Sequence, residues 1–287
     1  MRSILLVLLV LTFILILMGG LVHGTGSSLA CPDWPLCYGE FFPRMQGGVA
    51  IEHSHRLVAS LVGLLTLIFF LKTLRDSKVS SKFKKLSLFA FLLVVFQGVL
   101  GGITVIYRLP TLVSTAHLGA SMLFLAALFY LFLTINQNST HENQTSIPPC
   151  AHHFSLILLV LVYVQILLGA LVKHTGASLA CLEIPFCQGS LWPSGGSGLL
   201  YLHMTHRLVG MGLGILLLGF PIYLKVKNIS SHQPIWLLII LTAAQITLGF
   251  LSVYTYLDLP VALGHLGVGA LLLLTLVYIS IRVKASP

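Results

Sequence analysis

Four histidines are the residues of this chain best suited to carry chemistry, because they recur in register in two similar halves. His55 and His206 each begin the sequence His-Arg-Leu-Val, and His117 and His265 each begin His-Leu-Gly. All four lie in or at the start of long apolar segments, where a buried polar side chain is costly and usually functional. A lone histidine there is more often a satisfied core residue, but two pairs at matching positions favour a site.

Two imidazoles that face one another between apolar helices suit the axial positions of a haem iron, because the macrocycle supplies the remaining nitrogens. Zinc usually requires four ligands, often including cysteine or a carboxylate. We therefore predict a haem site in each half. The histidines interpreted as non-ligands lie at loop entrances, in loops or on another helix face: His23, His53, His141, His152, His153, His174 and His232.

Glu52 is the position where the repeat breaks, since the corresponding residue of the second half is His203. Glu52 lies three residues before His55, so both side chains share a face if the segment is helical. The apolar run that follows predicts that both occupy the first turn of a membrane helix. The carboxylate could accept a proton at a haem edge, or it could pair with Arg56 one turn later and stabilise the helix start.

Arg56 and Arg207 directly follow the first histidine of each half. Either guanidinium group could pair with haem propionates at the membrane surface. Alternatively, both arginines are interfacial anchors whose stems lie along apolar surface while the charged heads reach water. The sequence favours neither interpretation.

Four of the five cysteines form two equally spaced pairs in similar loops. The first pair is Cys31 and Cys37, and Cys31 directly follows Thr-Gly-Ser-Ser-Leu-Ala. The second pair is Cys181 and Cys187, and Cys181 directly follows Thr-Gly-Ala-Ser-Leu-Ala. The equal spacing predicts one disulfide in each loop and an oxidising compartment. Cys150 is predicted to be free.

The composition is that of an integral membrane protein, with 57% hydrophobic and 8% charged residues among 287, against about 25% charged residues in soluble domains. The formal charge of +9 reflects short basic loops rather than nucleic-acid binding. Continuous rather than alternating apolar runs exclude transmembrane strands. Eight segments reach the roughly 20 residues that span a bilayer: 4–22, 54–72, 85–106, 111–134, 153–172, 205–225, 234–254 and 260–282.

The distribution of Lys and Arg predicts the orientation. Eleven of the sixteen basic residues lie near the N-terminus, after the second and sixth segments, or in the tail. Because positively charged loops stay in the cytoplasm, both termini are predicted to be cytoplasmic. The cysteine loops 23–53 and 173–204 then lie outside a cytoplasmic membrane that the chain crosses many times.

The repeat defines the expected fold class. Each half starts on the cytoplasmic side and has four helices, so the repeat is parallel. We predict an all-α integral membrane protein whose eight transmembrane helices form two four-helix bundles, related by a pseudo-twofold axis along the membrane normal. The predicted domains are residues 1–135 and 153–287, joined by a cytoplasmic linker, 136–152.

Together these motifs resemble the heme A synthase family, in its bacterial form with two disulfide loops. The resemblance rests on the two Thr-Gly-x-x-Leu-Ala-Cys sequences, on Glu52-x-x-His55-Arg56 and on the three further histidines, and it covers essentially the whole chain. The family contains oxidoreductases that oxidise the C8 methyl group of haem O to a formyl group, giving haem A for terminal oxidases. One departure is that the second loop lacks the proline that follows Cys31.

The resemblance implies roles for particular residues. His55 and His117 would face the iron of the substrate haem O, His206 and His265 would hold a resident haem b, and Glu52 would be the catalytic carboxylate. It also implies heme O synthase as the supplier of the substrate and an electron donor that the sequence does not identify. A homo-oligomer is left open.

Two other functions are compatible with paired histidines. A di-haem b-type membrane cytochrome would transfer electrons without altering haem, but it has no evident use for Glu52, since a membrane carboxylate costs about 2.5–3.5 kcal/mol at mid-bilayer. A haem or small-solute transporter would show broken helices near the midplane, whereas the mid-helix positions here are mostly Leu, Val and Ile.

Overall fold

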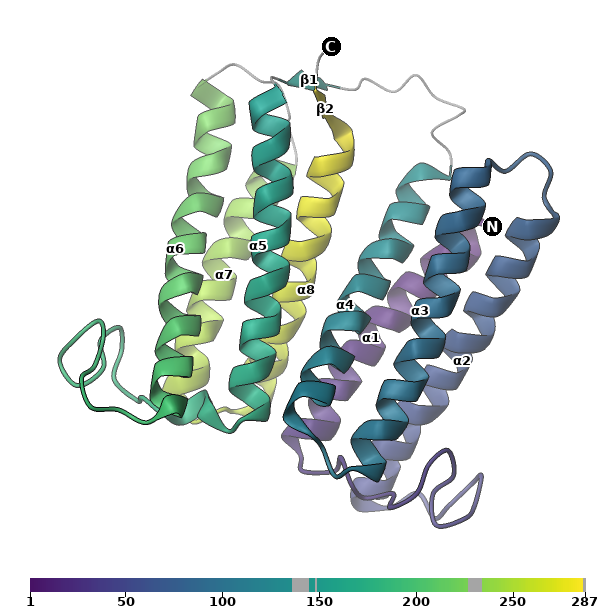
Figure 1. Cartoon of the computed structure of the whole chain (residues 1–287), viewed down its shortest axis with the longest axis horizontal. Coiled ribbons are helices and arrows are strands. Elements are labelled where there is room, and N and C mark those ends of the chain that lie inside the picture. Colours follow the sequence, from purple (N-terminus) through teal and green to yellow (C-terminus); the bar gives the residue numbers. More distant parts are fainter. Residues whose placement is uncertain (136–144, 148, 227–233, 286–287) are drawn as a thin grey trace. The chain divides into compact units, whose positions relative to one another are not determined.

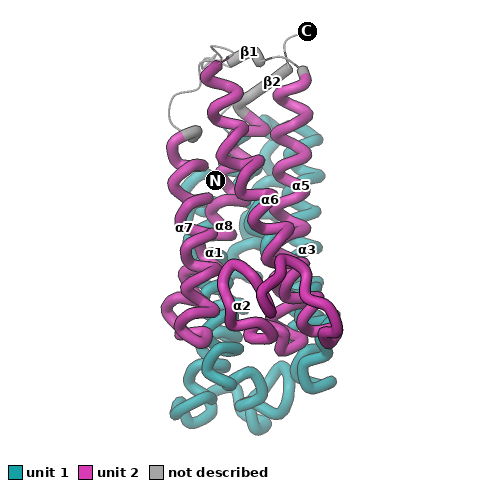
Figure 2. Tube along the Cα trace, turned by 90° about the vertical axis from the view of Figure 1, so that its left-hand side faces the viewer, with its two compact units in different colours: residues 1–140 teal, residues 141–287 magenta. Residues whose placement is uncertain are grey.

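The chain divides into two compact units, Met1–Thr140 and His141–Pro287 (Figure 2). The structure is a computed structural model that describes residues 1–135, 145–147, 149–226 and 234–285. Most of the predicted linker, together with His141 and His232, lies outside the described residues. Each unit contains four long helices.

Unit 1 is a ring of four antiparallel helices (Figure 1). Its helices are α1 (Arg2–Gly24), α2 (Gly47–Arg75), α3 (Ser81–Ile106) and α4 (Thr111–Thr134). Helices α1 and α3 each pack on both α2 and α4, which leaves α2 and α4 diagonally opposed. The loop between α1 and α2 carries the first cysteine pair, and the end of the bundle beside it is called the cysteine-loop end.

Unit 2 has the same ring arrangement, with α6 and α8 diagonally opposed. Its helices are α5 (Pro149–His174), α6 (Gly198–Val226), α7 (Pro234–Tyr254) and α8 (Leu259–Arg282), and the short 3₁₀ helix η1 (Ala177–Leu179) lies in its cysteine loop. One feature was not predicted: β1 (Thr145–Ile147) pairs in parallel with β2 (Val283–Ala285), outside the eight helices.

All eight predicted membrane spans are confirmed as helices long and apolar enough to cross a bilayer. Their outer surfaces carry exposed aliphatic side chains such as Leu92, Val160 and Ile240, which are 55%, 60% and 62% exposed. Apolar surface on this scale is a liability in water, but it is favourable against lipid tails. The chain is therefore an all-α, multi-pass membrane protein, and the pseudo-twofold relation between the units stays a prediction.

The prediction that Glu52 and His55 occupy a first turn is wrong. Helix α2 begins at Gly47, seven residues before the predicted span, and α6 likewise begins seven residues early, at Gly198. His55 therefore lies in the third turn, about 12 Å from the helix start at about 1.5 Å per residue. The span starts were predicted after the polar residues Glu52, His53 and His203, but these side chains are buried within the helices and do not end them.

The tightly packed apolar core of unit 1 lies away from the histidines. Helix α1 ends at the cysteine-loop end, while α2 and α4 begin there. The largest fully buried side chains lie late in α2, early in α1 or from the middle of α4 onward, which is the middle or the opposite half of the bundle: Leu5, Leu8, Phe69, Met122, Leu125, Leu128 and Leu131. Among the described residues of unit 1, no fully buried side chain of that size lies at the cysteine-loop end.

Candidate functional site

In unit 1, each predicted haem-ligating histidine packs against a glycine of a neighbouring helix. A Cβ atom added to Gly19 in α1 would lie 3.3 Å from Cε1 of His55 in α2, and one added to Gly101 in α3 would lie 3.4 Å from Cε1 of His117 in α4. Because α2 and α4 are diagonally opposed, the two imidazoles come from opposite sides of the bundle. Their positions are those expected of two axial ligands.

Unit 2 repeats this arrangement with closer contacts. A Cβ atom on Gly169 of α5 would lie 2.8 Å from Cε1 of His206, and one on Gly249 of α7 would lie 3.1 Å from Cε1 of His265. Real Cβ atoms essentially never approach closer than 3.0 Å, so alanine at position 169 would displace the His206 ring. The His206 ring thus depends on glycine at position 169, whereas a Cβ atom beside the other three rings would require a shift of a few tenths of an ångström at most.

The hydrogen bonding of the histidines differs between the units. In unit 1, Nδ1 of His55 and Nδ1 of His117 are both buried without a hydrogen-bond partner in the described part of the chain. In unit 2, the amide nitrogen of Gln165 lies 3.0 Å from Nδ1 of His206, and Nδ1 of His265 donates to the backbone carbonyl of Gln245 at 3.2 Å. Hydrogen bonds therefore orient both rings of unit 2, whereas in unit 1 neither Nδ1 atom has one within the described residues.

The two glutamines of unit 2 are suited to support metal-ligating histidines. A ligating imidazole normally donates its second N–H to an oxygen, which fixes the ring, and His265 already does so. The Gln165 amide also donates to the His206 carbonyl at 2.8 Å, and its Oε1 is buried without a partner among the described residues. A turn of that amide would bring Oε1 to the His206 ring, where it could accept from Nδ1–H, and would give up the hydrogen bond to the His206 carbonyl.

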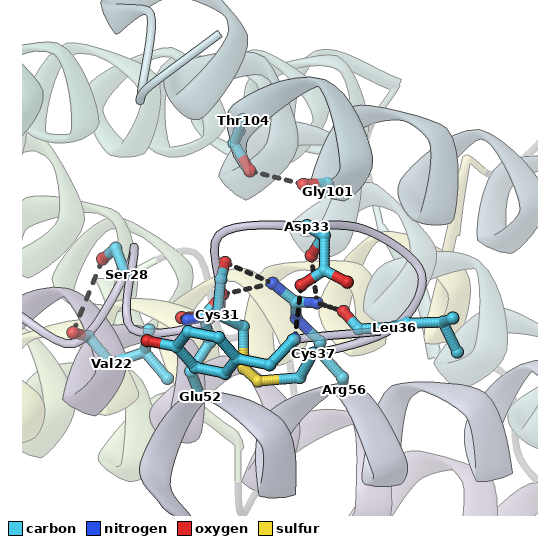
Figure 3. Close-up of polar contacts among 11 residues, drawn as sticks. Val22, Ser28, Cys31, Asp33, Leu36, Cys37, Glu52, Arg56, Gly101 and Thr104 are labelled. Carbon is cyan, nitrogen blue, oxygen red and sulfur yellow. Dashed lines mark hydrogen bonds and ion pairs between the residues drawn. A yellow bond between two sulfur atoms is a disulfide. The ribbon is translucent and has the colours of Figure 1, made fainter. Parts of the chain in front are cut away.

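Glu52 is buried and both of its oxygens accept hydrogen bonds (Figure 3). The backbone N–H of Cys31 donates to Oε2 at 2.8 Å, and the Arg56 guanidinium donates to Oε1 at 2.6 Å. The same guanidinium donates to the carbonyls of Cys31, Asp33 and Leu36 at 3.2, 2.7 and 2.6 Å. Glu52 and Arg56 therefore fasten the cysteine loop to α2.

The hydrogen bonds that fasten each cysteine loop to its helix are called the clamp. Unit 2 has the same clamp, with a histidine in place of the carboxylate. Nδ1 of His203 donates to the Ala177 carbonyl at 2.9 Å, and its Nε2 accepts from Arg207 at 3.1 Å. Arg207 also donates to the carbonyls of Cys181 and Glu183 at 3.0 and 2.6 Å. A neutral imidazole can accept on one side and donate on the other, so it replaces Glu52 in the clamp without replacing its charge.

The clamp bears on two alternatives that the sequence leaves open. Glu52 does pair with Arg56, so the carboxylate has a structural use and no longer argues by itself against an electron carrier. Arg56 and Arg207 are engaged with loop carbonyls rather than exposed at the membrane surface. The terminal nitrogens of both guanidinium groups are used in these contacts, which leaves Nε–H as the donor for any contact with a haem propionate.

Both predicted disulfides are present, Cys31–Cys37 and Cys181–Cys187, and Cys150 is free and exposed. Within the first loop, the Asp33 carboxylate accepts from the backbone N–H groups of Gly39 and Tyr38 at 2.8 and 2.7 Å. The Gly39 hydrogen bond is the main cause that lowers the pKa of Asp33 below its usual range. The charged carboxylate thus closes the turn that follows the disulfide.

His53 is buried beside the first disulfide and donates through Nε2 to the Phe41 carbonyl at 2.9 Å. Among the described residues, Cys31, Cys37 and His53 are the one group of three metal-ligand types within 4.8 Å of one another. Because the two sulfurs are bonded to each other, they are not available as ligands. His53 instead packs against the first cysteine loop and is hydrogen-bonded to it.

Sequence reasoning missed the glycines and Gln165. Gly101 and Gly249 were part of the visible repeat, but their contact with the histidines depends on how the helices pack. Gln165 has no counterpart in unit 1, where Leu15 occupies the corresponding position. A glutamine in the middle of an apolar span could have indicated a functional residue, since a polar side chain is costly in lipid.

The residues present fit a haem in each unit. Two neutral nitrogen ligands approach from diagonally opposed helices, glycines allow close approach beside each ring, and the buried Nδ1 atoms of His55 and His117 lack partners in the described chain. A buried polar atom without a hydrogen bond calls for an explanation such as an absent ligand. No cysteine or carboxylate completes a tetrahedral metal set around these histidines in the described residues.

Fold and site together define a multi-pass membrane protein built of two four-helix units with paired histidines. A family profile matches residues 2–277, and this chain belongs to that family, COX15-CtaA, described as cytochrome oxidase assembly protein. The match covers all eight helices except the end of the last.

Individual relatives agree with the family. The chain is 32% identical over 273 residues to the heme A synthase of Alkalihalophilus pseudofirmus, covering 93% of this chain and 92% of the relative. It is 32% identical over 272 residues to that of Halalkalibacterium halodurans, covering 93% and 91%. It is 31% identical over 313 residues to that of Shewanella oneidensis, covering 95% and 93%.

Proposed function

We propose that this chain is a heme A synthase, a membrane oxidoreductase that converts the C8 methyl group of haem O to a formyl group. The observation that carries the proposal is the match to heme A synthases over more than nine-tenths of the chain, on a fold that pairs histidines in both units. The electron-carrier alternative is not favoured, because these relatives are synthases.

Co-expression with heme O synthase in a host that has no heme A synthase tests this function. We expect haem A to appear when the extracted haems are separated by chromatography. A carrier would leave only haem B and haem O. The control is the same host with heme O synthase alone, which should accumulate haem O.

We propose a division of roles between the units, with haem b held by His206 and His265 and haem O bound by His55 and His117. The hydrogen bonds of Gln165 and Gln245 support this division, because they restrain the unit 2 rings, and Nδ1 of His265 donates to an oxygen as a ligating imidazole normally does. The Gln245 amide lies 3.3 Å from Nε2 of His265 and would have to withdraw for that nitrogen to hold a haem. The unit 1 rings lack such partners, which suits a site that must release its product. Bound haem b would supply a redox centre.

Replacing Gln165 by Leu, the residue at the corresponding position of unit 1, should weaken haem b binding by about 10- to 100-fold, because outer hydrogen-bond partners of metal ligands have effects of that size. Titration of purified, haem-depleted protein with haem b measures the affinity. The matched control is Gln97→Leu, since the Gln97 amide donates only to the His117 carbonyl in unit 1. Unchanged haem b affinity in Gln165→Leu would refute the supporting role.

Glu52 is the proposed catalytic carboxylate. A carboxylate has about four lone-pair sites, and its two hydrogen bonds to Cys31 and Arg56 leave others free to accept a proton from the reacting methyl group. The Arg56 guanidinium and the Cys31 N–H hold the carboxylate in one orientation. Its position three residues before His55 makes the two side chains neighbours on α2, which supports this role.

We propose that the protein lies in the cytoplasmic membrane with both termini inside, with heme O synthase and an electron donor as partners; a homo-oligomer is left open. The Lys and Arg bias and the two disulfides support this orientation. The test is labelling of a cysteine introduced at Lys78 in a Cys150→Ser background, whose other four cysteines are disulfide-bonded, using intact cells and a thiol reagent that does not cross membranes. We expect no labelling until the cells are opened, whereas labelling of intact cells would reverse the topology.

A further inference from the structure

The first cysteine loop presents a tryptophan to a glycine on the opposite side of the bundle mouth. A Cβ atom added to Gly102 in α3 would lie 2.8 Å from Cδ2, 3.0 Å from Cε3 and 3.1 Å from Cε2 of Trp34. The indole therefore lies directly on the backbone of α3, and no side chain larger than hydrogen fits beneath it. The seat is specific, because only glycine at position 102 permits this contact.

The loop around Trp34 is fixed at several points. Arg56 binds the carbonyls of residues 31, 33 and 36, the disulfide closes the ring around them, and Glu52 binds the Cys31 N–H. In Figure 3 this loop passes between Arg56 on α2 and Gly101 on α3. Trp34 thus extends from a loop clamped to α2 and reaches α3, across the cysteine-loop end of unit 1.

The seat is adjacent to the proposed substrate site. Gly102 immediately follows Gly101, the residue against which the His117 ring packs. One part of the indole rests on α3, and Trp34 remains 42% exposed. An aromatic side chain with a free surface beside a histidine ligand is suited to contact the edge or face of a porphyrin.

Unit 2 reverses the sizes of the two residues. The position of Trp34 corresponds to Ile184, and that of Gly102 corresponds to Phe250. The arginine clamp and disulfide are retained in unit 2, so the loop itself is common to both units. The combination of a large loop residue, Trp34, with a glycine on the helix, Gly102, therefore occurs in unit 1 alone, the unit proposed to bind the substrate haem.

We propose that Trp34 is a positioning residue that covers haem O at the cysteine-loop end of unit 1 and retains it during the reaction. This inference rests on the proposed function, because it takes the ligand of His55 and His117 to be haem O. Anchoring at the membrane surface, a common role for tryptophan, does not require a seat on a helix backbone. The proposal instead explains both the seat and its absence from unit 2.

The test measures how fast purified protein loaded with haem O loses it to an excess of apomyoglobin, followed by absorbance. We expect Trp34→Ala to release haem O roughly tenfold faster, which corresponds to about 1.4 kcal/mol, and Trp34→Phe to stay close to wild type because a ring remains. Gly102→Ala should resemble Trp34→Ala, since its new Cβ displaces the indole. The double variant should be no faster than either single variant.

The matched control is Ile184→Ala, the same loop position in unit 2, which should leave haem O release unchanged. Intact disulfides by mass spectrometry and a normal haem b content report folding. Should Trp34→Ala fail to fold, Gly102→Ala carries the test with every loop residue intact. Wild-type release rates in both variants would overturn the proposal. A wild-type protein that does not bind haem O at all would instead overturn the proposed function.

Discussion

Glu52→Gln should abolish haem A production while leaving haem b bound. Glutamine keeps the shape of the side chain and still offers an oxygen to the Cys31 N–H, but it removes the charge that faces Arg56 at 2.6 Å. On the proposed mechanism it also removes the proton acceptor, and general bases typically contribute about 10²- to 10⁴-fold to a rate. Haem extraction after co-expression with heme O synthase should show haem O or a partly oxidised haem in place of haem A.

The structural role of Glu52 requires a control that separates loss of charge from loss of the clamp. Glu183→Gln removes a carboxylate from the second cysteine loop, where it accepts from the Gly189 N–H at 3.2 Å, and haem A production should continue. An intact Cys31–Cys37 bond in Glu52→Gln would show that the loop has kept its closure. Near-normal haem A from such a protein would mean that Glu52 acts only in the clamp.

His206→Ala should remove the resident haem b from the purified protein. The substitution deletes one of the two nitrogens proposed to hold the haem, and with it the ring that lies 3.0 Å from the Gln165 amide nitrogen. A histidine ligand supplies much of the binding free energy of a metal centre, so we expect haem b content to fall by at least about tenfold. Pyridine haemochrome spectra of purified variant and wild type give the amounts.

The loss must be specific to the ligand rather than to folding. His203→Gln changes the neighbouring histidine of the same helix, which serves the loop clamp through Ala177 and Arg207, and it should retain most of the haem b. If His206→Ala kept the wild-type amount of haem b, the assignment of the resident haem to unit 2 would be wrong.

Much of the fold could be predicted because its signals are local. Continuous apolar runs identified all eight spans, and the equal spacing of two cysteine pairs identified both disulfides. The starts of α2 and α6 were predicted seven residues late, at positions after the polar residues Glu52, His53 and His203. Those side chains are buried by contacts with the cysteine loops, which the residue types do not reveal.

The parts of the site that could not be predicted depend on contacts between distant segments. Arg56 binds carbonyls that lie 20 to 25 residues earlier in the chain, and a carbonyl acceptor leaves no trace in residue types. From the sequence, the Arg56 guanidinium was therefore expected to contact either haem propionates or the membrane interface. Similarly, the seat of Trp34 on Gly102 depends on which face of α3 meets the loop.

The division of roles between the units is tested most directly by a matched pair of variants, His55→Ala and His206→Ala, each purified after co-expression with heme O synthase. Chromatography of the extracted haems measures haem B, haem O and haem A in each protein. His55→Ala should keep its haem B and lose bound haem O and haem A, whereas His206→Ala should lose haem B. Loss of haem B from His55→Ala together with its retention in His206→Ala would contradict the account.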